Sequence, residues 1–159
     1  PIKLYLLFEK LLSDKNDKNL DNAEQFLFEN TENLYIEDTK KCFTHLINVY
    51  ANYLRNNKLE YVPIALRVFK KGIEMGIVLD KDNITSVRFT NIVNLACQQQ
   101  DFDWVQTFIK DFQIYLNKSE KRETVLLAKA NLLFSKENYD ETIKLLNEGK
   151  CKNMGNEAK

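Results

Sequence analysis

Cys42 and His45 form the pair whose residue types and spacing come nearest to chemistry. They are three residues apart, so on a helix they share one face. A thiol beside an imidazole can act as a reactive pair or supply half of a metal site. His45 is the only histidine, however, and Cys97 and Cys151 are remote in the sequence and form no CxxC spacing. A zinc site needs further ligands, so we favour a partly buried thiol beside a surface imidazole.

Two pairs of acidic residues, Asp101/Asp103 and Asp140/Glu141, have the composition of a glycosidase acid/base pair. Both pairs stand where helices are expected to begin, and acidic side chains there suit the helix dipole and cap free N–H groups. That explanation is sufficient. The chain also lacks the motifs G-x-S-x-G, G-x-x-x-x-G-K-[ST], G-x-G-x-x-G and H-E-x-x-H. We therefore expect no catalytic residues, no metal and no cofactor, in a protein that is not an enzyme.

The composition indicates a globular helical protein. The chain has 159 residues, of which 44% are hydrophobic and 29% are charged, with only four Gly and two Pro. So few turn residues disfavour a strand-rich fold. Lys+Arg and Asp+Glu both total 23, and a net charge of zero argues against general binding to nucleic acid or its phosphate backbone.

The expected setting is the cytoplasm, away from membranes. No stretch is long and apolar enough to cross a bilayer, and the apolar start of the chain is interrupted by Glu9 and Lys10 and lacks a cleavage site for a signal peptide. An odd number of widely separated cysteines indicates reduced thiols. Because the chain begins with Pro1 rather than Met, we expect it to be a piece of a longer protein.

Apolar residues recur at helical spacing along the whole chain, separated by short polar turns. The pattern predicts eight helices and no sheet. They are expected over Ile2–Leu12, from Asp21, over Asp38–Asn56, from Pro63 to Gly72 or Gly76, from a cap at Asp82 or Thr85, from Asp101, over Ser119–Lys136, and over Asn138–Gly149, before a polar tail at 150–159.

The last four of these helices repeat at a fixed interval. Four apolar or small residues of the last pair superpose on the previous pair at an offset of 37: Leu126 on Phe89, Ala130 on Val93, Tyr139 on Phe102, and Leu146 on Ile109. Self-similarity at this period is typical of stacked units, none of which buries its own apolar face alone. An irregular bundle with accidental periodicity is the alternative.

Short motifs within this pattern resemble the tetratricopeptide repeat, a helix–turn–helix of about 34 residues. The segment Ala65-x-x-x-Phe69 matches the A-x-x-x-F element of the second helix, and Ala23-x-x-x-Leu27 is a looser copy. Residues 138–143, Asn-Tyr-Asp-Glu-Thr-Ile, resemble the family turn G-D-Y-D-E-A-I. No proline closes a unit, so glycines are expected to do so. The resemblance implies an all-α, right-handed α-α superhelix (solenoid) of about four repeats, forming a single domain over residues 1–149.

Packing expectations follow from the same pattern. Small residues at Ala65, Ala96 and Ala130 suit close helix crossings. The stripes Phe43/Leu46/Tyr50, Phe102/Phe108/Phe112 and Tyr139/Leu146 are expected in the core or between repeats. The first helix is apolar on nearly all sides, so we expect it to be buried, either by a neighbouring helix or by association with a partner chain.

The family resemblance also implies a concave groove lined by the first helix of each pair. The family's groove positions, carried over, are Ile47, Ala51, Arg55, Thr90, Asn94, Gln98, Leu127, Asn131 and Ser135. Asn94 and Asn131 are one repeat apart, and carboxamides can bind an extended peptide backbone whatever its sequence. Alanine at both positions is expected to weaken partner binding and leave thermal stability nearly unchanged.

Three functions are therefore compared. The leading one is a non-enzymatic protein–protein interaction module that holds a peptide or helix of a partner protein. The second is a single-stranded RNA-binding helical repeat, which is suggested by a faint resemblance of residues 66–80 and the next helix to a pentatricopeptide repeat. A fragment of a larger regulatory protein is a further alternative. The third is an enzyme with a site at Cys42 and His45, for which bound zinc would be the sign.

Overall fold

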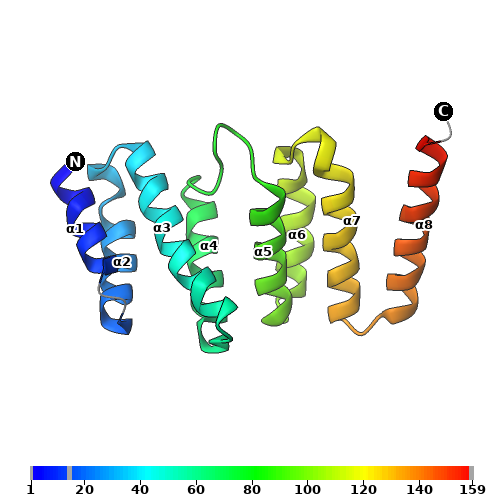
Figure 1. The fold of residues 1–159 in the computed structure, drawn as a ribbon, viewed down its shortest axis with the longest axis horizontal. Helices are drawn as coiled ribbons and strands as arrows, with labels where there is room; N and C mark the ends of the chain where they lie inside the picture. Colours follow the sequence, from blue (N-terminus) through cyan, green and yellow to red (C-terminus); the bar gives the residue numbers. More distant parts are fainter. Residues whose placement is uncertain (1, 14–15, 158–159) are drawn as a thin grey trace. The chain divides into compact units, whose positions relative to one another are not determined.

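The computed structural model describes the backbone of residues 2–13 and 16–157, and in this part of the chain every named element is a helix (Figure 1). The prediction of an all-α protein is confirmed. The α-helices are α1 (Ile2–Ser13), α2 (Asp17–Glu29), α3 (Ile36–Arg55), α4 (Val62–Glu74), α5 (Ser86–Gln98), α6 (Phe102–Phe112), α7 (Lys118–Ser135) and α8 (Tyr139–Glu157), with three short 3-10 helices at Thr31–Asn33, Leu59–Tyr61 and Gln113–Tyr115.

The chain divides into two compact units, residues 1–78 and 79–159. In the first unit, α1 packs against α2 and α3, α2 against α3, and α3 against α4. In the second, α5 packs against α6 and α7, α6 against α7, and α7 against α8. Each unit is thus two helical hairpins whose first helices contact each other. A single domain spanning residues 1–149 stays a prediction.

Several helix ends lie where local chemistry predicts them. Pro63 occupies the first turn of α4, where its missing N–H has no helical partner to lose. The Thr85 side chain caps α5 by accepting a hydrogen bond from the Arg88 N–H at 3.1 Å. The second helix begins earlier than predicted, because the Asn16 side chain caps it by accepting from the Asn19 N–H at 2.9 Å. Asp21 therefore lies within α2 rather than at its cap.

The expected role of the glycines is correct at only one position. Gly76, with φ of +69°, follows the end of α4 in the left-handed conformation that glycine adopts without strain. Gly72 and Gly149 instead lie inside α4 and α8 and are buried. A Cβ at Gly72 would lie 2.5 Å from Cε2 of Phe43, and one at Gly149 would collide with Leu126. These two glycines allow close packing, and α8 continues to Glu157.

The first unit has a core of large side chains that includes the predicted stripe of Phe43, Leu46 and Tyr50, all buried. Phe43 and Phe69 meet edge to face, with centroids 5.9 Å apart. Beside this core the Glu24 carboxylate accepts two hydrogen bonds from Arg67, at 3.0 and 2.7 Å. Glu24 is 5% exposed, so the pairing with Arg67 compensates for its lost hydration.

In the second unit the buried residues of α5 and α6 form the centre, among them Phe89, Ile92, Val93 and Val105. Phe108 stacks on both Trp104 and Phe112, with centroids 5.3 and 4.8 Å apart. The core prediction is wrong for Tyr139, which is 51% exposed and meets the exposed ring of Phe134.

Within this chain α1 is not covered on all sides, and its burial by a further helix or a partner chain stays a prediction. Phe8 and Leu12 face the core of the first unit, whereas Leu6 is 59% exposed and Leu7 is 47% exposed. The two groups lie on different sides of the helix, and α2 and α3 cover only one of them.

Candidate functional site

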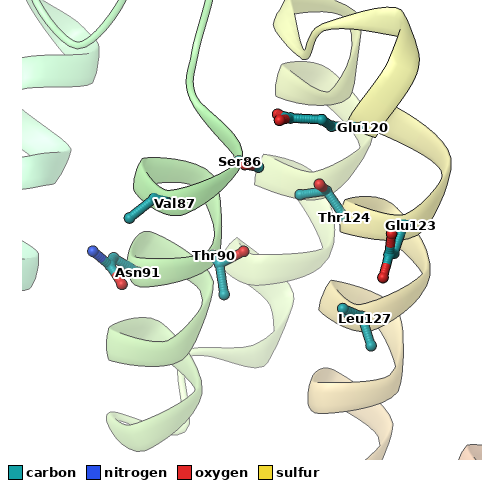
Figure 2. Close-up of a pocket in the computed structure, with 8 residues that line it drawn as sticks. All are labelled: Ser86, Val87, Thr90, Asn91, Glu120, Glu123, Thr124 and Leu127. Atoms are coloured by element: carbon teal, nitrogen blue, oxygen red, sulfur yellow. The ribbon is translucent and has the colours of Figure 1, made fainter.

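A groove of about 410 Å³ lies between α5 and α7 in the second unit (Figure 2). From α5 it is lined by Ser86, Val87, Thr90 and Asn91, and from α7 by Glu120, Glu123, Thr124 and Leu127. Both helices are first helices of their hairpins and pack directly against each other.

The lining combines apolar, hydroxyl and acidic groups. Val87 is 68% exposed and Leu127 is 50% exposed, so both offer apolar surface to a ligand. Ser86, Thr90 and Thr124 add hydroxyls, and Glu120 and Glu123 add two carboxylates. No basic residue is among the eight that line it. The groove can thus offer apolar contact, hydrogen bonds and negative charge to a ligand.

Thr124 is the most buried side chain of the lining, with 6% of its surface exposed. Within the described part of the chain its hydroxyl makes no hydrogen bond, although it lines the groove. Among the described residues the only fully buried side-chain oxygen or nitrogen without a partner is the Tyr50 hydroxyl, so the Thr124 oxygen is reached by solvent in the groove. A ligand in the groove could supply a hydrogen-bond partner for it.

Asn94 and Asn131 lie one helical turn further along α5 and α7 and bind each other. Asn131 Nδ2 donates to Asn94 Oδ1 at 2.6 Å, and the Ser135 hydroxyl donates to Asn131 Oδ1 at 3.3 Å. Ser135 in turn interacts with the buried Cys97, whose pKa is raised by burial and partly lowered by this hydrogen bond. The carboxamides are therefore partly engaged in holding α5 against α7.

The structure places six of the residues predicted for the groove on α5 and α7 and the other three in the first unit. Thr90 and Leu127 line it. Asn94, Asn131 and Ser135 form the network beyond it, and Gln98 is exposed at the end of α5. The remaining three, Ile47, Ala51 and Arg55, belong to α3 in the first unit.

Sequence reasoning missed six lining residues: Ser86, Val87 and Asn91 of α5, and Glu120, Glu123 and Thr124 of α7. A signal for them was present. The offset of 37 that pairs Thr90 with Leu127 also pairs Ser86 with Glu123 and Val87 with Thr124. Extending the aligned stretch by one turn would have found four of the lining residues directly.

The Cys42 and His45 pair does not form a reactive site. Cys42 is fully buried, and burial, followed by the charges of Glu9 and Asp38, raises the pKa of its thiol to about 12. The thiol thus stays protonated at neutral pH, whereas a nucleophile needs the thiolate. His45 pairs with another residue: its Nδ1 lies 2.6 Å from Glu9 Oε1. Together with Leu12, Ser13, Asn48 and Val49, these two line a smaller pocket of about 350 Å³.

The described residues contain no group of three or more His, Cys, Asp or Glu side chains that could hold a metal ion. Cys42 and Cys97 are free thiols, and the Cys151 side chain lies outside the part that the structure describes. The acidic pairs begin helices, as predicted: Asp101 and Asp103 open α6, and Asp140 and Glu141 open α8. Glu141 accepts a hydrogen bond from the Asn138 side chain at 2.9 Å.

Among the described helices, none combines the length and the apolar character needed to cross a membrane. In comparisons with known proteins, no family model, no curated protein and no solved structure matches this chain.

Proposed function

We propose that this chain is a non-enzymatic protein-interaction module that holds an extended segment of a partner protein in the groove between α5 and α7. The observation that carries the proposal is the groove itself, in which exposed Val87 and Leu127 stand beside unpaired hydroxyls and carboxylates. Apolar surface and hydrogen-bonding groups in one groove are what an extended peptide requires, since its side chains alternate with backbone donors and acceptors.

The proposal includes a tetratricopeptide-like solenoid of about four repeats, working in a reducing compartment such as the cytoplasm. Support comes from the shared packing pattern of the two units and from the contact between Asn94 and Asn131, which lie 37 positions apart. In stacked repeats, equivalent residues of successive first helices are neighbours. Association with a partner chain through α1 is a second, weaker prediction, because Leu6 and Leu7 of that helix are exposed.

Binding of single-stranded RNA is the less favoured alternative. The two carboxylates of the groove repel phosphates, and the chain carries no net positive charge to offset that repulsion. An oligouridine probe that bound the chain at low salt, with loss of binding on blocking the groove, would reverse this preference.

The test is selection of binders from a random peptide library displayed on phage, with the whole chain as bait. Each binder is then measured against Thr90→Trp, whose indole fills the groove, and against Lys129→Trp, a matched change at an exposed residue of α7 outside the groove. We expect the selected peptides to lose affinity for T90W and keep it for K129W. Peptides that bind T90W as tightly as the unaltered chain would refute the groove.

A further inference from the structure

We infer that the groove between α5 and α7 selects peptides that carry a lysine or arginine beside an aliphatic residue. This inference rests on the proposed function and adds the class of ligand. It depends on three features of the groove: two carboxylates on α7, a hydroxyl without a partner on the largely buried Thr124, and aliphatic side chains left exposed beside them.

The carboxylates set the charge of the ligand. Glu120 and Glu123 are three residues apart on α7, so they share one face of the helix. Both are exposed, and neither forms an ion pair with a residue of the described chain. Figure 2 shows the Glu120 side chain extending from α7 towards α5 across one end of the groove. With no basic residue in the lining, a cationic side chain meets attraction there and an acidic one meets repulsion.

The Thr124 hydroxyl makes this more than an acidic patch. It is the polar group of a side chain that is more than nine-tenths buried, it lines the groove, and it lacks a hydrogen-bond partner within the described residues. A peptide N–H or C=O placed over it would satisfy it, because a hydroxyl both donates and accepts. Thr90 offers a second hydroxyl from the facing helix, so a backbone laid between α5 and α7 has a partner on each side.

The aliphatic residues set the remaining part of the ligand. Leu127 lies one turn beyond Glu123 on α7, and Val87 belongs to the lining on α5; both are at least half exposed. Lysine and arginine carry apolar stems that cover such surface while their charged ends stay near water. A neighbouring aliphatic residue of the peptide would cover the rest. An extended segment with a basic and an aliphatic side chain therefore matches the lining better than an acidic peptide does.

The experiment uses four pools of labelled nonapeptides whose central residue is Lys, Arg, norleucine or Glu and whose other positions are drawn from Ala, Leu, Ser and Thr. Binding to the whole chain is measured by fluorescence anisotropy. The variants are E120Q/E123Q, E120K/E123K and the control Glu148→Gln, an exposed residue of α8 that is not in the groove. Trp104 fluorescence in urea checks that each variant remains folded.

We expect the Lys and Arg pools to bind more tightly than the norleucine pool, and the Glu pool to bind least. Each carboxylate should contribute about two- to five-fold, as exposed ion pairs do. The preference should vanish in E120Q/E123Q, reverse in E120K/E123K, persist in E148Q, and weaken in about 1 M NaCl, where the Debye length is about 3 Å.

Two other results separate the inference from the proposal on which it rests. If the norleucine pool binds as tightly as the Lys pool and T90W abolishes both, the groove binds peptides but the assignment of a basic ligand is wrong. If no pool binds, or if binding is equal in T90W, the inference and the groove proposal both fail. Binding of oligouridine in competition with the Lys pool would also overturn the inference.

Discussion

Asn131 donates a hydrogen bond from Nδ2 to Oδ1 of Asn94 at 2.6 Å, joining residues that occupy equivalent places in successive hairpins, 37 positions apart. The same offset was read from apolar residues alone, so the contact links the sequence repeat to the packing of α5 on α7. It also changes what these residues are expected to do. Groups that hold two helices together cannot be removed without affecting stability.

Asn131→Ala should lower the free energy of unfolding by about 1–2 kcal/mol, because the part-buried amide of Asn94 loses its partner. This replaces the expectation that alanine at these positions leaves stability nearly unchanged. N94A/N131A should cost less than the sum of the single variants, since each single change already breaks the shared bond. Urea unfolding followed by Trp104 fluorescence measures this, because the only tryptophan lies in the second unit.

Gln98→Ala is the control for that series. Gln98 is exposed on α5, one turn beyond Asn94, so its truncation should change stability by less than about 0.5 kcal/mol. The interpretation is wrong if N131A loses no more stability than Q98A, or if the double variant is strictly additive.

Tyr50→Phe should leave the protein as stable as before or stabilise it by about 1 kcal/mol. The Tyr50 side chain is 1% exposed, and its hydroxyl is a buried group with no hydrogen-bond partner in the described chain. Removing such a group removes its desolvation cost. Urea unfolding followed by circular dichroism tests this, with Tyr35→Phe at a residue 68% exposed as the control. A loss of more than about 1 kcal/mol would mean that the hydroxyl is bonded.

Alkaline pH provides an independent test of Tyr50. Burial, followed by the charges of Glu24 and Asp21, raises the pKa of its hydroxyl above the ordinary value of 10.0. Above that value the unfolded chain releases the proton and the folded chain keeps it, so the free energy of unfolding falls as pH rises. Y50F should show a shallower fall between about pH 9 and pH 11. Parallel curves for Y50F and the unaltered chain would contradict the assignment.

Gly72→Ala should destabilise the protein by about 1–3 kcal/mol, although alanine favours helix over glycine by about 1 kcal/mol. The added Cβ would lie 2.5 and 2.7 Å from ring atoms of Phe43. That ring is fully buried and is held against Phe69, so it has little room to move. Thermal unfolding followed by circular dichroism measures the effect.

Gly149→Ala is the matched variant and should change stability by less than about 0.5 kcal/mol. Its Cβ would meet the end of the Leu126 side chain, which is part-exposed and can adopt another rotamer. Equal losses for the two variants would show that helix propensity or chain context, rather than the rigidity of the neighbour, decides the cost.

Cys42 should resist thiol reagents in the folded protein. Its pKa of about 12 and its complete burial keep it protonated and out of contact with solvent. In a Cys151→Ser background, with C42S and C97S separating the two buried thiols, reaction with a disulfide reagent at pH 8 should be negligible and become rapid in urea. Prompt labelling of Cys42 in the folded chain would contradict this prediction and support the hypothesis that Cys42 and His45 form a reactive pair.

The local chemistry of the helices could be predicted from the sequence. Pro63 and Thr85 each favour a helix start through their own backbone or side chain, and such effects reach only a few residues along the chain. The apolar periodicity and the offset of 37 indicated an all-α fold in which hairpins pack on one another, because burial of a helix face depends on the pattern of side chains along it.

Only the tertiary structure decided which side chains meet. The sequence cannot distinguish Gly72, which makes room for Phe43, from Gly76, which ends a helix, because the difference depends on what lies opposite each residue. Likewise, Asn94 and Asn131 were recognisable as equivalents, but their contact and the extent of the groove towards Glu120 depend on how α5 packs on α7. The spacing of residues along one helix determines which of them share a face, whereas a site between helices also depends on the distance and angle between the two helices.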